Sequence, residues 1–284
     1  MKLFYYQSKK GLRNFGDDLN PWLWKRIFPN VFNGNSQSLF LGIGTILNSN
    51  IPEAKNIAVL GAGAGYGELP KIDARWKIYS VRGPLTAEAL HLPPELGIID
   101  PAILGSDFFK PQRKRQKKFA YMPHYQHAVA SDASLKRICD DLAIDYIDPR
   151  LPVDTVLEKI GSTDCMLAEA MHAAVAAEAF RIPWIPVVST DLIYTFKWED
   201  WCRSIDLEYH PQQIIPLWNL KTNASLFTKL RHSVKSKIMK YQLKKIMRHA
   251  PRYLTENHLF ETKKRALWQK CQEFSRDFAQ GHFN

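Results

Sequence analysis

Residues 1–220 alternate short apolar runs with helical segments, and each run ends at a glycine or at a polar turn. This alternation is typical of α/β proteins, in which helices connect the strands of a parallel sheet. In the first half we expect strands at residues 3–6, 38–46, 57–60 and 78–81, with a loop at 14–20 and a helix through Trp22, Leu23 and Ile27. Another helix should follow Arg82, because Pro84 suits the first helical position, where a missing N–H costs nothing.

A second α/β unit is expected after a charged, glycine-free linker at residues 114–118. Its strands are predicted at residues 119–122, 145–147, 163–168 and 184–188, and its helices at 135–142, 153–160 and around His172. The chain should therefore form two Rossmann-like domains, residues 1–113 and 119–220, followed by a basic helical extension, residues 221–284. Two such domains facing each other would bind ligands at the carboxyl ends of their strands.

The helix before the last of these strands sets one titratable side chain, His172, between an acidic residue and a run of small residues. The small residues are Ala170, Ala173, Ala174, Ala176 and Ala177. They present little bulk beyond Cβ, so a ligand or a neighbouring strand can approach the helix backbone closely. Pro183 then ends the helix, and a buried parallel strand is predicted to follow.

The formal net charge of +11 is concentrated at one end of the chain. Residues 221–284 hold 15 Lys and Arg against 4 Asp and Glu, which leaves 24 residues of each sign in residues 1–220. A neutral body with a basic end does not point to a nucleic-acid partner, because the location of the charge matters more than its size. We therefore predict no nucleic-acid binding.

Within the basic segment, apolar residues repeat at helical spacing: Phe227, Leu230, Val234, Ile238 and Tyr241. Basic residues occupy the positions between them: Lys229, Arg231, Lys235, Lys237, Lys240, Lys244 and Lys245. One interpretation is an amphipathic helix that lies on an anionic membrane surface or binds an anionic polymer. The other is a packed terminal helix with a solvated basic face. The pattern alone leaves both open.

The four cysteines, Cys139, Cys165, Cys202 and Cys271, are widely separated. They show neither the CxxC spacing of a zinc site nor the density of a disulfide scaffold, so we expect a reducing compartment and no metal site. The chain start is too polar after Tyr6 for a signal peptide, and the longest apolar stretch, around residues 173–188, is interrupted by charged residues and prolines. A cytoplasmic protein without a membrane span is expected.

A glycine-rich loop, GAGAGYG at residues 61–67, follows the third predicted strand. Its spacing is G-x-G-x-G, no helix follows directly, and no acidic residue stands at the distance that a dinucleotide site requires. The loop therefore does not predict NAD binding. Two interpretations remain, namely backbone amides that approach a phosphate and glycines that only permit tight turns.

Eight short motifs follow one another through most of residues 10–205. They are NFGDDLN (14–20), GIGTIL (42–47), VLGAGAGYG (59–67), VRGPLTAEAL (81–90), DPAIL (100–104), YMPHY (121–125), AMHAAVAAEAFRIP (170–183) and FKWEDWCRSI (196–205). Their kinds and order resemble the polysaccharide pyruvyl transferase family. The chain departs from the family pattern at Ala170, Met171 and Ala173 around the histidine, and at Ile99 before Asp100.

The resemblance implies two Rossmann-like domains in a GT-B-like arrangement. It also implies transfer of pyruvate from phosphoenolpyruvate onto two hydroxyls of a sugar as a cyclic ketal. The acceptor would be a sugar of an exopolysaccharide or of its lipid-linked precursor. On the membrane interpretation of the basic segment, residues 221–284 would hold the cytoplasmic enzyme at the inner face of the membrane. Phosphoenolpyruvate is the donor substrate, and no cofactor is expected.

Ketal formation requires proton delivery to the methylene carbon and proton removal from the attacking hydroxyl, and a histidine near neutrality suits such transfers. The resemblance points to His172 as the principal acid/base or phosphate-contacting group, with Asp17 or Asp100 as partners in hydroxyl activation. Substrate-binding roles are expected for Arg82, His124, Asn14, Gly16, Gly61, Gly63, Gly65, Lys197 and Asp200. The alternatives are helix caps for the two aspartates, a turn for His124 and a structural ion pair for Arg82.

Two other functions fit the same residues. A nucleotide-sugar glycosyltransferase of the same fold would bind diphosphate at a helix N-terminus and ribose through an acidic residue such as Glu178. A non-catalytic polysaccharide-binding or assembly protein would use the eight tryptophans and the basic end for stacking and for contacts with an anionic polymer.

Overall fold

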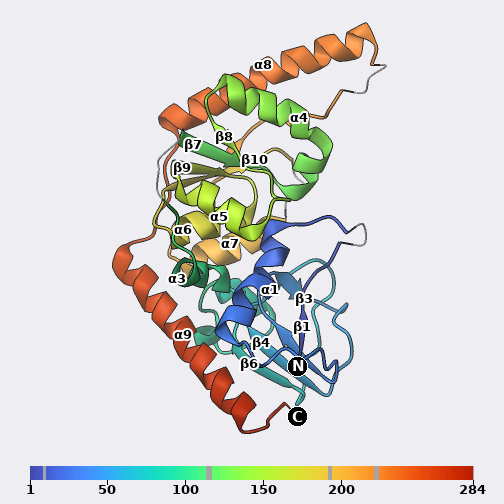
Figure 1. The fold of residues 1–284 in the computed structure, drawn as a ribbon, viewed down its shortest axis with the longest axis vertical. Helices are drawn as coiled ribbons and strands as arrows, with labels where there is room; N and C mark the ends of the chain where they lie inside the picture. Colours follow the sequence, from blue (N-terminus) through green and yellow to red (C-terminus); the bar gives the residue numbers. More distant parts are fainter. Residues whose placement is uncertain (9–10, 113–116, 191–193, 221–223, 284) are drawn as a thin grey trace. The chain divides into compact units, whose positions relative to one another are not determined.

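The computed structural model describes residues 1–8, 11–112, 117–190, 194–220 and 224–283 (Figure 1). The chain forms two compact units. Unit 1 comprises Met1–Phe108, Tyr194–Tyr209 and Thr255–Asn284, and unit 2 comprises Phe109–Ile193 and His210–Leu254. The predicted division into residues 1–113, 119–220 and 221–284 stays a prediction. Residues 114–116 of the expected linker and the start of the basic segment at 221–223 lie outside the described residues, and the last two linker residues, 117 and 118, belong to a strand.

Unit 1 is built on short parallel strands with helices between them. Its elements are β1 (Lys2–Phe4), α1 (Phe15–Ile27), β2 (Ser38–Leu41), β3 (Thr45–Leu47), β4 (Asn56–Leu60), β5 (Gly63–Ala64), β6 (Trp76–Ser80), α2 (Pro84–Ala89), the 3₁₀ turns η1 (Pro94–Leu96) and η2 (Pro101–Leu104), α3 (Gly105–Phe108), α7 (Thr195–Ser204) and α9 (Asn257–Ala279). The main sheet has the order β1-β2-β4-β6, and β3 pairs separately with β5. All pairings are parallel, so the predicted α/β class is confirmed for this unit.

The strand predicted over residues 38–46 is two strands in the structure. β2 ends at Leu41 and β3 begins at Thr45, and Gly44 between them has a φ of 121°, a backbone conformation that favours glycine. The break directs β3 away from the main sheet to pair with β5. Continuous apolar character does not reveal such a change of partner.

The prediction of a loop at residues 14–20 is wrong, because α1 already begins at Phe15. Asn14 is its N-cap residue in extended conformation, and Asp17 lies in the first turn, where the helix dipole favours negative charge. The sequence NFGDDLN predicts a loop, but acidic residues near a helix start stabilise the helix.

Pro21 lies inside α1 without breaking it. Proline lacks the N–H that would bond the carbonyl of Asp17, four residues earlier. The side-chain amide of the buried Asn20 donates to that carbonyl at 3.3 Å, and it also bonds the carbonyl of Ile43 at 2.8 Å. The Asn20 side-chain oxygen accepts from the Ile43 N–H at 2.9 Å, so one side chain compensates for the proline and holds α1 to the segment after β2.

The last helix, α9, completes the core of unit 1. Phe274 of α9 packs against Phe28, Phe40 and Tyr79, with ring centroids 4.8–5.5 Å apart. The hydroxyl of Tyr79 donates to Asp277 at 2.6 Å. The end of the basic segment is thus built into this unit rather than detached from it.

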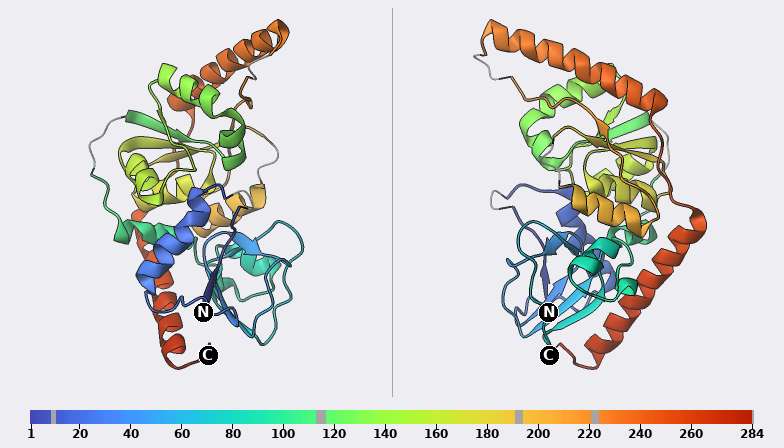
Figure 2. Two further views of the ribbon diagram at one scale, coloured as in Figure 1. Left: turned by 45° about the vertical axis from the view of Figure 1, so that its right-hand side comes forward. Right: turned by 180° about the vertical axis from the view of Figure 1, so that it is seen from behind.

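Unit 2 is a five-stranded parallel sheet with helices between its strands (Figures 1 and 2). Its elements are β7 (Lys117–Met122), α4 (Tyr125–Asp141), β8 (Asp145–Tyr146), α5 (Val153–Gly161), β9 (Thr163–Ala168), α6 (Met171–Ala179), β10 (Trp184–Val188), β11 (Gln212–Gln213) and α8 (Leu226–His249). The predicted strands at 163–168 and 184–188 match β9 and β10, and α4 begins ten residues before its predicted start at 135.

The strand order β11-β10-β9-β7-β8 reverses direction between β7 and β9. From β7 the chain moves to one edge, at β8, and then returns to the other side of β7, at β9. In open parallel sheets, such a switch point leaves a crevice at the carboxyl ends of the two central strands, where ligands bind. In unit 2 this position is occupied by the residues that follow Met122 and Ala168.

Candidate active site at the strand ends

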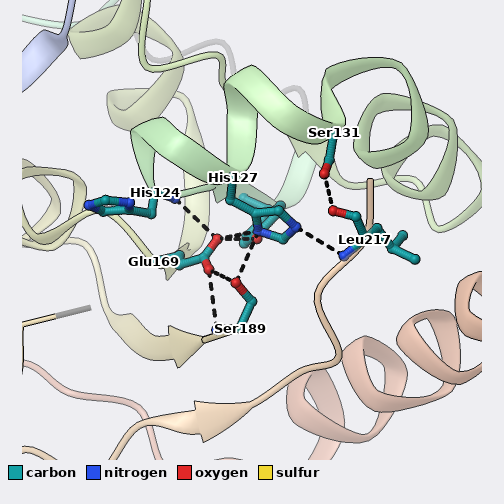
Figure 3. A network of polar contacts seen from close by, with 7 residues as sticks. His124, His127, Ser131, Glu169, Ser189 and Leu217 are labelled. Carbon is teal, nitrogen blue, oxygen red and sulfur yellow. Dashed lines mark hydrogen bonds and ion pairs between the residues drawn. The ribbon is translucent and has the colours of Figure 1, made fainter. Parts of the chain in front are cut away.

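The carboxyl edge of the unit 2 sheet is organised around one buried carboxylate, Glu169, directly after β9 (Figure 3). One of its oxygens, Oε2, accepts from the Tyr121 hydroxyl at 2.6 Å, the His124 N–H at 3.1 Å and His127 Nδ1 at 2.9 Å. The other, Oε1, accepts from the backbone N–H of Ser189 at 3.2 Å and from its hydroxyl. Glu169 therefore joins the ends of β7, β9 and β10 at the switch point.

The donors around Glu169 hold it in its ionised form. Burial by itself would raise its pKa, but hydrogen bonds from His127, Ser189 and Tyr121 outweigh burial and lower the pKa below its ordinary value. The N–H of Leu217 points to His127 Nε2 at 3.4 Å. An acceptor role for Nε2 leaves the proton on Nδ1, where it is donated to Glu169.

The predicted residues His172 and His124 both lie on this edge. His172 is the second residue of α6, which begins three residues after β9, and the residue is partly exposed, with Nε2 of its ring buried. His124 is the N-cap residue of α4, and its backbone N–H is bound to Glu169. Unpaired N–H groups at a helix start favour anions. The two histidines thus stand on helices that start from adjacent strands.

Glu169 is the main residue of this edge to which the sequence analysis assigns no role. It was visible only as the acidic residue before His172. A carboxylate directly after a buried strand is a usable signal, but its five donors come from residues 121–189 and are brought together only by the strand order.

In unit 1 the predicted residues Arg82 and Asp200 form a fully buried ion pair, with Nε and Oδ2 2.9 Å apart. The guanidinium also donates to the Thr45 hydroxyl at 2.7 Å, and its remaining nitrogen lies 3.4 Å from the carbonyl of Ala64. Asp200 in turn accepts from the N–H and hydroxyl of Thr86 at 2.9 and 2.6 Å. This cluster ties α7 to the start of α2 and to the glycine loop.

Two glycines of the loop leave room for this packing. A Cβ on Gly63 would lie 2.1 Å from Cζ of Arg82, and a Cβ on Gly65, whose φ is 134°, would lie 2.5 Å from the ring of Tyr194. Both glycines therefore accommodate side chains of unit 1. Close packing is thus one role of these glycines, and the approach of their backbone amides to a phosphate stays a prediction.

Replacing Asp200 by alanine is expected to destabilise the protein by about 3–5 kcal/mol, because it leaves the buried guanidinium of Arg82 without its counter-ion. Urea unfolding of the purified protein measures this. Asp73→Ala is the matched control, since Asp73 pairs with Arg75 at 2.7 Å on the surface, where water screens the ion pair and its loss should barely change the free energy of unfolding. Equal destabilisation by the two substitutions would contradict the assigned importance of the buried pair.

A second group in unit 1 surrounds Lys197, on α7. Its Nζ lies 3.5 Å from the hydroxyl of Tyr66, and the Tyr66 ring lies 5.0 Å from that of Tyr194. Burial, together with the nearby charge of Arg82, lowers the pKa of Lys197 to about 8, against an opposite effect of Asp17. Lys197, Arg82 and Asp17 therefore lie close enough in unit 1 for the charges of Arg82 and Asp17 to act on Lys197, and their roles in a site stay predictions.

The other predicted residues of unit 1 have clear local roles. The buried Asp100 caps η2 by accepting from the Ala102 N–H at 2.9 Å. Asn14 donates to Asp17 at 2.7 Å, and Gly16 is buried within the first turn of α1. Gly61 contacts the ring of Pro101 through the space that a side chain would fill. The capping alternative thus describes one of the contacts of Asp100, and catalytic roles for Asp17 and Asp100 remain proposals.

Glu178, considered above as a ribose ligand, is buried near the end of α6. It pairs with Arg181 at 2.5 Å and accepts from the indole N–H of Trp184 at 2.8 Å. These contacts do not favour the glycosyltransferase interpretation. Within the described residues, no group of three or more His, Cys, Asp and Glu side chains is arranged to hold a metal ion, and no helix is long and apolar enough to cross a membrane.

The chain matches the family model "Polysaccharide pyruvyl transferase" over residues 5–191, and it belongs to that family. The resemblance drawn from the eight motifs is therefore confirmed, and the protein is a transferase by family. It is also 42% identical over 219 residues to the succinoglycan biosynthesis protein ExoV of Rhizobium meliloti (strain 1021), an alignment that covers 75% of this chain and 68% of ExoV. No solved structure has detectable similarity to the chain.

Proposed function

We propose that the protein transfers pyruvate from phosphoenolpyruvate onto a sugar of an exopolysaccharide, or of its lipid-linked precursor, as a cyclic ketal. Family membership and the 42% identity to a succinoglycan biosynthesis protein are the observations that support this most directly. The two units with parallel sheets are compatible with Rossmann-like domains, and we propose that they work as a GT-B-like pair in the cytoplasm.

The reaction consumes both hydroxyls of the acceptor and releases phosphate. One hydroxyl oxygen attacks C2 of the enol group while the methylene carbon takes up a proton and becomes a methyl group. The second hydroxyl then displaces phosphate from the same carbon, and the two hydroxyl protons are balanced by the proton gained on carbon and the one released with phosphate. Each step needs a positioned proton donor or acceptor and a cationic environment for the donor substrate.

The residues can be assigned to these tasks. His172, at the start of α6, would transfer a proton or contact the phosphate, and His124 would assist it from the start of α4. Asp17 or Asp100 would activate a hydroxyl. Lys197, which is only partly buried, would bind a donor oxyanion directly.

The remaining binding residues of unit 1 would support that contact. Arg82 and Asp200 are already engaged with each other, so we assign them chiefly to holding α7 and the glycine loop at Gly61, Gly63 and Gly65 in place. Asn14 and Gly16 would position Asp17 at the start of α1.

Calorimetric titration with phosphoenolpyruvate tests the proposal, with UDP-glucose and GDP-mannose as competing donors. We expect binding of phosphoenolpyruvate alone. The affinity should fall as the pH rises through about 8, because the Lys197 ammonium loses its proton there and its attraction for the donor anion disappears.

Lys197→Arg is the matched variant for this titration, since arginine keeps its charge over the whole range and should show no such fall. Preferential binding of a nucleotide sugar would instead identify a glycosyltransferase. A pH dependence that is the same in both proteins would remove Lys197 from the donor site.

A further inference from the structure

Helix α8 has two apolar faces, and only one of them is packed. Met239, Leu243 and Ile246 are buried in the core of unit 2, which includes Leu135 and Ile138 of α4. Six other apolar side chains of α8 are exposed: Leu226, Phe227, Leu230, Val234, Ile238 and Tyr241. Their exposed fractions run from 41% for Ile238 to 85% for Leu226, so the packed-helix interpretation fails for the residues that suggested it.

The exposed residues form one continuous stripe on the side of α8 opposite its buried face. At 3.6 residues per turn they fall within an arc of about 120°, and the three buried residues are centred about 160° away from the middle of that arc. The first turns of α8 extend past α4 in every view (Figures 1 and 2). A contiguous exposed apolar stripe of this size indicates an interaction surface.

The stripe is bordered by positive charge along its length. Arg231 and Lys235 lie beyond one edge of it, Lys229 and Lys240 lie beyond the other, and Lys237 lies within it near the second edge. Lys244, Lys245 and Arg248 continue the same face toward the end of the helix, and residues 226–249 contain neither Asp nor Glu. Lys240 is engaged with Asp141, so the remaining cations set the charge of this surface.

Trp218 extends the surface beyond α8. The residue is 53% exposed, and the centroid of its ring lies 4.6 Å from Nζ of Lys235. Tryptophan is favoured at the boundary between lipid headgroups and acyl chains, where its ring is partly apolar and its N–H remains hydrated. An aromatic side chain beside a basic, apolar stripe matches the composition of helices that lie in this boundary.

We propose that the outward face of α8, defined by the six exposed apolar residues and their bordering cations, docks on a bilayer that contains anionic lipids. The apolar side chains enter the headgroup region, and the cations bind lipid phosphates. An acidic polysaccharide would satisfy the cations but not the apolar stripe. A second copy of the same face would bring like charges together without any carboxylate to pair them. This surface is independent of pyruvyl transfer.

Cosedimentation of the full-length protein with vesicles tests this, using phosphatidylglycerol-containing vesicles against neutral phosphatidylcholine vesicles. We expect binding to the anionic vesicles at low salt, and loss of that binding at high salt. Phe227→Ser/Leu230→Ser and Lys237→Gln/Lys244→Gln should each reduce it about tenfold or more, because they remove the apolar or the ionic contribution. Circular dichroism of each variant establishes that it is folded.

Lys263→Gln/Arg265→Gln, on α9, is the matched control, since it removes the same charge from a helix of unit 1 and should leave binding unchanged. The proposal is overturned if the full-length protein does not bind anionic vesicles, or if the control reduces binding as much as the α8 variants do. It is equally overturned if sedimentation velocity reveals a dimer that Phe227→Ser/Leu230→Ser dissociates, because a second copy would then cover the stripe.

Discussion

A His172→Ala enzyme is expected to lose about 10²–10⁴-fold in kcat, the range associated with removal of a proton-transferring side chain. The expected change in Tm is small. His172 stands at the second position of α6 and is partly exposed as a residue, so alanine leaves the helix in place. Inorganic phosphate released from phosphoenolpyruvate in the presence of acceptor glycan measures the turnover.

His232→Ala is the control for this experiment. His232 is on α8, where it contacts Ser134 at 3.1 Å, and its loss should alter neither kcat nor donor affinity. If His172→Ala unfolds the protein instead of slowing it, the histidine is a structural residue. If turnover is unchanged in a folded His172→Ala enzyme, proton transfer and phosphate contact must both be assigned elsewhere.

Glu169→Gln is expected to produce the second large effect. Glu169 acts by holding neighbouring residues in position and not by contacting the substrate. The carboxylate accepts hydrogen bonds at both oxygens from Tyr121, His124, His127 and Ser189. An amide nitrogen in place of either oxygen would face donors, so we expect a loss of about 2–4 kcal/mol in stability. The loop that holds His124 and the start of α6 should shift, which lowers kcat/KM for phosphoenolpyruvate.

Glu178→Gln is the matched control, because Glu178 is also a buried glutamate of unit 2 but lies near the other end of α6. Glu178→Gln should lower the free energy of unfolding, because it weakens the contacts of residue 178 with Arg181 and Trp184, while kcat/KM stays close to the wild-type value. Urea unfolding and steady-state kinetics on both variants separate the two effects. An equal fall in kcat/KM in both variants would mean that Glu169 acts only through global stability.

The strands of unit 2 were the most predictable part of the fold. β9 and β10 are buried parallel strands whose apolar runs end at Glu169 and Ser189, so their limits follow directly from the residues. The start of α1 was not predicted. The sequence NFGDDLN was interpreted as a loop, and the hydrogen bonds of Asn20 with the carbonyls of Asp17 and Ile43 explain why α1 continues through Pro21.

The candidate site was predictable one residue at a time. Arg82, His124, His172 and Asp200 could be singled out from motifs, but not their partners. Arg82 and Asp200 are separated by more than a hundred residues, and their pairing depends on where α7 packs in unit 1. The role of Glu169 depends on the reversal of strand order between β7 and β9, which no local pattern reveals.

The family, the α/β class and the positions of the candidate histidines were determined by the sequence alone, because strand periodicity and short motifs are local properties. The tertiary structure decided which polar groups meet and which apolar residues remain exposed. The apolar residues of α8 fall on two faces of the helix, and helical spacing does not show which face is buried. Only the packing of Met239, Leu243 and Ile246 into unit 2 leaves the face of Phe227 and Leu230 in solvent, because burial is settled by the neighbouring elements and not by the helix itself.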